Sequence, residues 1–170
     1  MRRAIELYVR YVDGLNRLVG RFAMRLLFVL GAILLYATLS RLILGIPVNW
    51  ALEMSQFVLS AYYLLGGAYS LQLDSHVRMD LLYGRLSPRR RAVTDAITIL
   101  FVIFYLVVLF MGGVSSTHYA IEYGQKNYTS WEPVLWPIKV IMTFGIFLML
   151  LQTISSFFKD VAMARGRPLA

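Results

Sequence analysis

The sequence predicts an all-α integral membrane protein with four transmembrane helices and an N-terminal amphipathic helix at the membrane interface. Hydrophobic residues make up 59% of the 170 residues and the mean hydropathy is +0.64, whereas soluble domains are usually about 45–50% apolar. The excess lies in four long apolar runs. The net charge of +8 comes mostly from basic residues between these runs. This placement favours orientation in a membrane over nucleic-acid binding.

The four apolar runs cover residues 22–44, 50–73, 92–116 and 134–158. As a helix, the first run of about 23 residues would reach roughly 35 Å, enough to cross a bilayer. The uncharged connection 45–49 predicts a tight hairpin between the first two spans, and its Pro47 and Asn49 suit a helix start. We therefore expect a transmembrane domain over residues 22–158 and a tail over residues 159–170.

The positions of Lys and Arg predict the direction of the spans. Five basic residues precede the first span, five lie between the second and third, and three follow the fourth. On the other side of the membrane only Lys126 is found, in the outer loop between the third and fourth spans. The positive-inside rule places both termini and the middle loop in the cytoplasm of a bacterial inner-membrane protein.

Residues 1–21 are too charged to span a membrane. Apolar residues recur at helical spacing, which predicts an amphipathic arm on the cytoplasmic interface. Gly14 and Gly20 are possible bend points between this arm and the first span. The alternative is that the arm continues the first span straight into the cytoplasm. The apolar positions are Ile5, Tyr8, Val12, Leu15, Val19 and Phe22.

Charged side chains inside the spans need a reason, because each costs about 2.5–3.5 kcal/mol at the bilayer centre and less near the ends. Arg41 lies one turn before the end of the first span and Glu53 one turn into the second. The hairpin sets them at a similar depth, so we expect them to form an ion pair. Lys139, near the start of the fourth span, is a third candidate at that level.

The second span carries small and polar residues at alternating steps of three and four, which puts them on one face of the helix. A face of this kind packs against protein rather than lipid. Part of it would contact the other spans of this chain, and the rest leaves room for an external partner. The residues are Glu53, Gln56, Ser60, Tyr63, Gly67, Ser70 and Asp74.

The sequence shows no pattern of catalysis or cofactor binding. It has no cysteine, which excludes disulfides, iron–sulfur clusters and thiol catalysis in this chain. Its two histidines, His76 and His118, are predicted on opposite sides of the membrane and so cannot share a metal ion or haem. No phosphate-binding loop or dinucleotide fingerprint is present. The chain therefore resembles an accessory membrane subunit more than an enzyme, and we expect no cofactor in it.

Several motifs resemble one family of membrane subunits. Glu53 opens the second span, Leu65–Ala68 follows, and the loop then reads His76-Val77-Arg78-Met79-Asp80 before Leu86–Arg91. Together with Leu135–Lys139 and the length and span count, these motifs resemble the small membrane (DctQ-type) subunit of tripartite ATP-independent periplasmic (TRAP) transporters. The His76–Asp80 segment, with Arg78 at its centre, is the most specific element.

The resemblance implies a sodium-driven importer of an organic acid or related solute. A periplasmic solute-binding protein would deliver the solute, and a large membrane subunit would hold the substrate and sodium sites and move as an elevator. The present chain would be the fixed partner that braces this large subunit, in contact with membrane lipids. His76, Arg78 and Asp80 would cap the second span, or contact the large subunit or lipid headgroups.

A small four-helix drug/proton antiporter is the alternative function. Such a protein needs a carboxylate deep within a span that is accessible from both sides of the membrane. Glu53 lies near one end of its span, which disfavours this alternative. A membrane enzyme or haem protein is disfavoured by the positions of the histidines.

Overall fold

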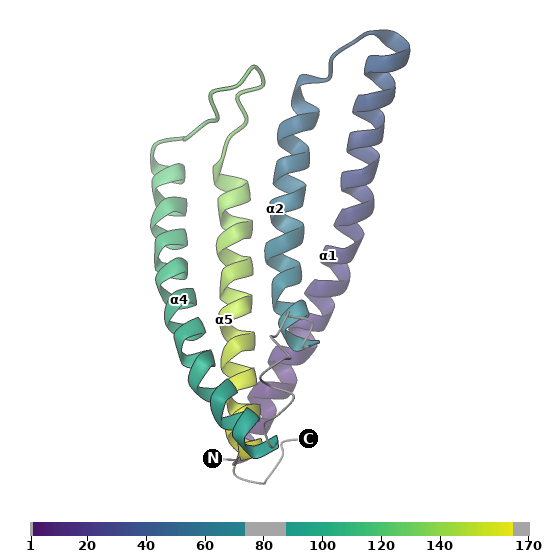
Figure 1. The fold of residues 1–170 in the computed structure, drawn as a ribbon. Coiled ribbons are helices and arrows are strands. Elements are labelled where there is room, and N and C mark those ends of the chain that lie inside the picture. The colour runs from purple at the N-terminus through teal and green to yellow at the C-terminus, as the bar shows by residue number, and fades with distance from the viewer. Residues whose placement is uncertain (1, 74–87, 165–170) are drawn as a thin grey trace.

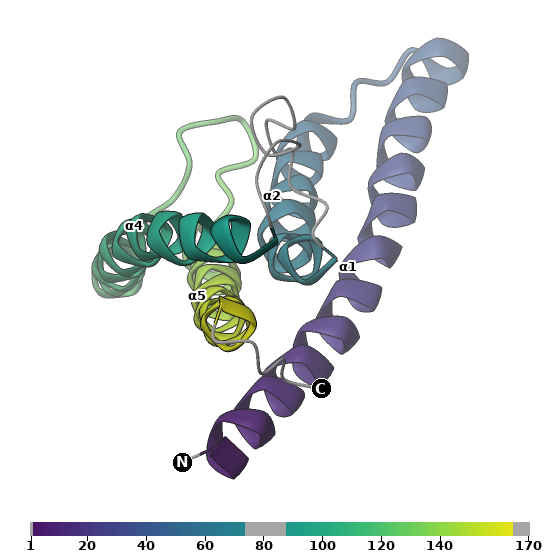
Figure 2. The same ribbon diagram turned by 60° about the horizontal axis from the view of Figure 1, so that its bottom comes forward.

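The computed structural model describes residues 2–73 and 88–164, which form four helices and confirm the all-α class. Helix α1 spans Arg2–Leu44, α2 Asn49–Gln72, α4 Pro88–Glu122 and α5 Trp136–Ala164. The helices stand in an open row in the order α4, α5, α2, α1 (Figure 1), and neighbours in this row pack together. The N-terminal part of α1 also crosses the end of α5 (Figure 2).

Three of the described helical segments are long and apolar enough to cross a membrane: Ile5–Leu44, Ile97–Glu122 and Trp136–Met163. Helix α2 has 24 residues, so it has the length but not the hydropathy of a typical span. Polar residues such as Gln56 and Ser60 lower its hydropathy, and α2 lies between α1 and α5 (Figure 1). Four spans therefore remain a prediction, and three carry a clear apolar signature.

The hairpin between α1 and α2 is as tight as the sequence predicts. Gly45 follows the last residue of α1 with a φ of 66°, the left-handed conformation that commonly ends a helix and that glycine adopts without steric cost. α2 begins at Asn49. We call this end of the molecule, together with the loop 123–135, the hairpin end, and the opposite end the terminal end.

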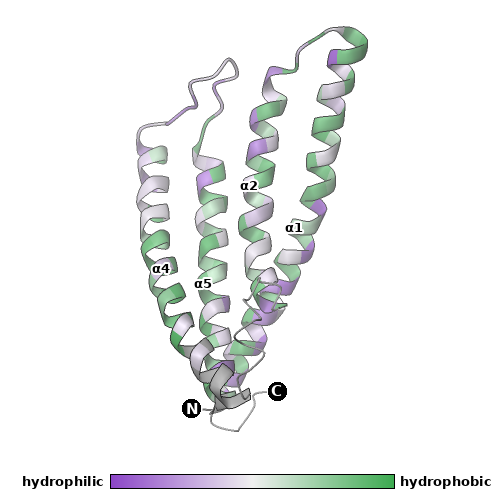
Figure 3. Ribbon diagram, viewed as in Figure 1, coloured by the Kyte–Doolittle hydropathy of each residue, from purple (hydrophilic) through white to green (hydrophobic). Residues whose placement is uncertain are grey.

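Helix α1 is a single unbroken helix of 43 residues. Bend points expected at Gly14 and Gly20 are absent, because the helix runs through both positions and Gly20 packs against Tyr69 of α2. Hydrophilic residues gather on the half of α1 nearest the terminal end (Figure 3). The arm is therefore a straight extension of the first span, as in the alternative above. Where the membrane surface meets α1 is still a prediction.

The face of the arm that is buried differs from the face that carries the apolar residues named in the sequence analysis. Leu15 and Phe22 of the stripe are exposed, whereas Asn16 is fully buried. The buried residues follow helical spacing on one face of α1: Val9, Val12, Asn16, Gly20 and Ala23. A polar side chain thus occupies the centre of the contact with the rest of the protein.

Asn16 belongs to a polar cluster that joins α1 to α5, more than 130 residues away in the chain. Its amide donates to Gln152 Oε1 at 2.6 Å, and Gln152 Nε2 donates to Asp13 Oδ1 at 3.0 Å. Lys159 Nζ lies 2.6 Å from Asp13 Oδ2, and the Ser155 hydroxyl donates to Oδ1 at 3.4 Å. Buried polar groups need such partners, so this α1–α5 cluster fixes one angle between the two helices.

Small residues allow α5 to approach its other neighbours. Gly145 faces the backbone of Leu64 on α2 so closely that an added Cβ would lie 2.9 Å from three of its atoms. On the α4 side, Gly113 lies against Thr143, and the hydroxyls of Thr117 and Thr143 are 3.0 Å apart. Small side chains that let helix backbones come together are typical of helix contacts in membranes. The α2–α5 contact therefore depends on the missing side chain at position 145.

We expect Gly145→Ala to destabilise the protein by about 1–3 kcal/mol, because the methyl group overpacks the contact with Leu64. Gly112→Ala is the matched control: its Cβ would meet nothing within 4 Å, and alanine favours helix by up to about 1 kcal/mol over glycine. Thermal unfolding in detergent should show a lower midpoint for the first variant and an unchanged or higher one for the second. Equal midpoints would contradict this account of the α2–α5 contact.

We expect Asp13→Ala to loosen the arm, because Gln152, Ser155 and Lys159 lose their acceptor. Hydrogen bonds to a partly buried charge of this kind contribute about 1–3 kcal/mol. Hydrogen exchange of the amides at the start of α1 should accelerate. Arg10→Ala, at an exposed position of the same helix, should leave the exchange unchanged. If both variants exchange alike, the α1–α5 cluster does not hold the arm.

Candidate partner interface

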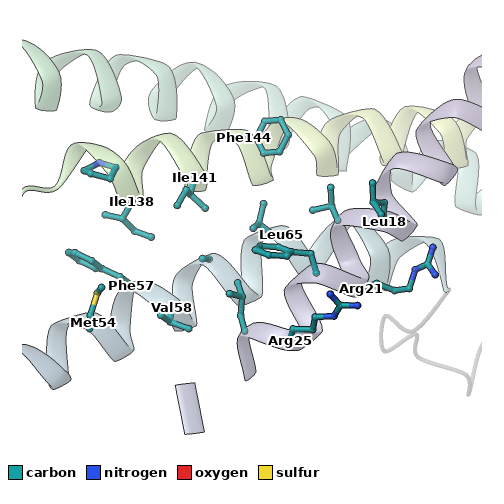
Figure 4. A pocket seen from close by; sticks show the side chains of 15 residues that line it. Leu18, Arg21, Arg25, Met54, Phe57, Val58, Leu65, Ile138, Ile141 and Phe144 are labelled. Atoms are coloured by element: carbon teal, nitrogen blue, oxygen red, sulfur yellow. The ribbon is translucent and has the colours of Figure 1, made fainter. Parts of the chain in front are cut away.

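A large apolar groove opens between α1, α2 and α5. Its volume is about 910 Å³, and Figure 4 shows side chains from α2 and α5 facing each other across it. We call it the apolar groove. Its lining is Leu18, Val19, Arg21, Phe22, Arg25 and Leu26 of α1, Met54, Phe57, Val58, Ala61 and Leu65 of α2, and Pro137, Ile138, Ile141 and Phe144 of α5.

Only the α1 wall of the apolar groove carries charge. Arg21 and Arg25 are both exposed and lie at one end of the groove (Figure 4). Arg21 Nε donates to the carbonyl oxygen of Arg17 at 3.4 Å. The rest of the lining offers methyl groups, aromatic rings and a proline. Such a surface suits another apolar helix or lipid chains rather than a polar substrate.

Exposed apolar surface is widespread in this open row of helices. For each helix we take the most apolar window of 18 residues. The share of this window that is buried within the chain is 0% in α1, 6% in α4 and 33% in α5. Phe101 and Phe104 of α4 and Phe28 of α1 are each more than two-thirds exposed. Apolar patches of this extent mark contact with lipid or with another protein. Within the described residues, the apolar faces of α1 and α4 are thus left for other molecules to cover.

The polar and small stripe of α2 divides among different surroundings. Glu53 is buried, whereas Gln56 and Tyr63 are exposed. Gly67 faces Met149 of α5. The Ser60 hydroxyl donates to the Gln56 carbonyl at 2.8 Å, and Ser70 is half-buried. One part of the stripe thus packs within the chain, and the exposed part is free for another molecule. Its role at a subunit interface stays a prediction.

Four of the singled-out residues lie outside the residues that the structure describes. They are Asp74, which ends the stripe, and His76, Arg78 and Asp80 of the loop motif. Their proposed roles in capping or contact remain predictions.

The three charges expected to pair at the hairpin end do not form the predicted ion pairs. Arg41 and Glu53 line the same cavity. Glu53 Oε2 nevertheless has no hydrogen-bond partner within the described chain. Lys139 Nζ instead donates to Gln125 Oε1 at 2.7 Å and to the Ser116 hydroxyl at 2.9 Å. Lys139 fastens the outer loop to the end of α4 and does not reach Glu53.

The outer loop between α4 and α5 is ordered by its own backbone. Leu135 N donates to the Gln125 carbonyl at 2.9 Å, and Asn127 N to the Pro133 carbonyl at 3.0 Å. These bonds surround an isolated bridge between Lys126 and Val134. The role of Gln125 has no signature in the sequence, because it depends on a lysine 14 residues further along.

The arrangement offers little for chemistry. Among residues 2–73 and 88–164, no three His, Asp or Glu side chains gather in a way that could hold a metal ion. His118 lies 3.5 Å from Glu122 on the exposed end of α4. The prominent features are an apolar groove, a buried carboxylate and unburied helix faces, all of which suit contact with other molecules of the membrane.

Comparison with known proteins gives one clear match. A search of curated proteins found no match to the chain. A family model described as "Tripartite ATP-independent periplasmic transporters, DctQ component" matches residues 30–163. The match covers all of α2, α4 and the outer loop, most of α5 and the last third of α1. The resemblance seen in the sequence is thereby confirmed: the chain belongs to the DctQ family, a membrane-protein component of tripartite ATP-independent periplasmic transporters.

Proposed function

We propose that this chain is the small permease subunit of a sodium-coupled TRAP transporter in the bacterial inner membrane. It braces a large elevator subunit while that subunit imports an organic acid or related solute. A periplasmic binding protein delivers the solute, and the coupling sodium ions bind to the large subunit. The family match supports a role as transporter component. The open row of helices supports a scaffold that is completed by another protein.

The observation that carries this proposal is the apolar groove. Three helices frame a volume of about 910 Å³ that no side chain of the described chain fills. A transmembrane helix is about 10–12 Å across with its side chains, so one helix face can seat its side chains between α2 and α5. Helices associate in membranes through such close packing, since lipid tails are as apolar as leucine. A helix of the large subunit is the proposed occupant.

The distribution of charge supports an orientation for this scaffold. Basic residues gather toward the terminal end, including Arg10, Arg17 and Arg21 of α1. The positive-inside rule then places that end in the cytoplasm and the hairpin end in the periplasm. The outer loop, held by Lys139, would face the periplasm, where the binding protein approaches.

We expect Val58→Trp, which fills the middle of the apolar groove, to reduce copurification of the large subunit at least tenfold. The loss of one well-packed contact of about 1.4 kcal/mol corresponds to a factor of ten. Val108→Trp is the matched control, since Val108 is 54% exposed on α4 and lines neither large cavity. The measurement is affinity capture through a tag on this chain, with solute uptake in vesicles that hold all three components.

The proposal also predicts that the chain transports nothing by itself. Uptake of a solute by liposomes that contain this chain alone, driven by a sodium gradient, would contradict it. Unchanged capture of the large subunit by the Val58 variant would leave the family assignment intact but would remove the groove as the site of contact.

A further inference from the structure

A second cavity lies at the hairpin end, separate from the apolar groove. Its volume is about 620 Å³. The end of α1, the start of α2 and the outer-loop residues Thr129 and Ser130 line this open cavity. It is lined by one cation, Arg41, and one carboxylate, Glu53, together with leucine side chains such as Leu34 and Leu52. We call it the hairpin cavity.

One oxygen of the Glu53 carboxylate lacks a donor within the described chain. The residue is 5% exposed, and its Oε2 is buried without a hydrogen-bond partner within the described chain. A buried acceptor without a donor is destabilising, and a buried charge without a partner is more so. The position lies one turn inside α2. A ligand in this cavity would therefore supply an N–H group, preferably a cationic one.

Arg41 is the complementary group. Its side chain is exposed and forms no hydrogen bond or ion pair with any residue that the structure describes. The guanidinium is a fork of donors that suits a phosphate. A cationic side chain from another protein would satisfy Glu53 but would leave Arg41 without an anion. A ligand with both an ammonium and a phosphate satisfies the two residues together.

The surroundings place the cavity at headgroup depth. The Tyr36 and Trp50 rings stack with centroids 6.2 Å apart on the two helices that form the cavity, and such rings favour the interface between lipid tails and water. Leucine side chains beside the charges offer a surface for acyl chains. A ligand here meets charged groups and hydrocarbon within one site, as a phospholipid does.

We infer that the hairpin cavity binds the headgroup of a phospholipid with a primary ammonium, that is, a phosphatidylethanolamine. The ammonium donates hydrogen bonds to the Glu53 carboxylate, and the phosphate accepts from the Arg41 guanidinium. Phosphatidylcholine has the same charges, but its trimethylated nitrogen carries no N–H to donate. Phosphatidylglycerol brings no cation for Glu53. The site thus distinguishes headgroups by their hydrogen-bond donors and not only by their charge.

The test measures retained lipid on the full chain, purified together with its partner subunits. The assembly is exchanged into an equimolar mixture of phosphatidylethanolamine, phosphatidylcholine and phosphatidylglycerol, and native mass spectrometry counts the lipids that stay bound. We expect phosphatidylethanolamine to dominate. Glu53→Gln and Arg41→Gln should each lower its retention about tenfold, because each loses a charge-assisted contact. Arg25→Gln, a change at the apolar groove instead, should have no effect.

A comparison of lipids with increasing methylation can be made on the wild-type assembly. It needs no variant, so it does not depend on the folding of mutants. Retention should hold for N-methyl and N,N-dimethyl phosphatidylethanolamine, which keep an N–H, and fall for the trimethylated lipid. Equal retention of all headgroups would overturn the inference. So would retention that Glu53→Gln leaves unchanged, as expected if a lysine or arginine of another subunit, or Arg41 itself, fills the need of Glu53. Neither result would bear on the contact at the apolar groove.

Discussion

The packing of α5 against its three neighbours is the interaction on which the rest of the structure depends. α5 meets α4 through Thr143 and α2 through Gly145, and it meets the arm of α1 through Gln152. The first two contacts rely on small or hydroxylated residues that let backbones approach. The third relies on buried amides. If α5 shifted, both the apolar groove and the angle of the arm would change together.

Much of the fold could be predicted because the underlying signals are local. The first apolar run was expected to end at residue 44, and helix α1 indeed ends at Leu44, with Gly45 directly after it. The long apolar runs placed the other helices to within a few residues, apart from longer extensions of α4 beyond residue 116 and of α5 beyond residue 158. The family motifs also lie in the sequence itself, and they led to the correct family.

What escaped prediction depends on partners that are distant in the chain. In the sequence alone, Asn16 looks like a solvent-exposed residue of an amphipathic helix. Its burial becomes evident only from the structure, in which Gln152 lies against it. Arg41 and Glu53, which were expected at a similar depth, line one cavity without forming an ion pair. Depth, however, fixes only the position along the helix axis. Whether two side chains meet also depends on the rotation of each helix and on the rotamers, which hydrophobic patterns do not record.

The modest hydropathy of α2 follows from its position between α1 and α5. A helix with protein on two sides needs little lipid-compatible surface, so polar and small residues are tolerated there. Hydropathy alone therefore underestimates α2, whereas α1 and α4, with nearly all of their apolar windows unburied, give clear signals. α5, the other inner helix of the row, keeps a clear signal although 33% of its window is buried.

Because α1 is one unbroken helix, a tilt of the arm would also displace the far end of α1. From Asn16 to Leu44 the helix rises about 42 Å, at about 1.5 Å per residue. A rotation of about 10° around the contact of Asn16 with Gln152 would move the far end of α1 by about 7 Å, by the same helical rise. The hydrogen bond of Asn16 at the terminal end and the packing of α1 against α2 thus act together on the position of the hairpin. A force on the arm would therefore be felt at the hairpin, at the far end of the same helix.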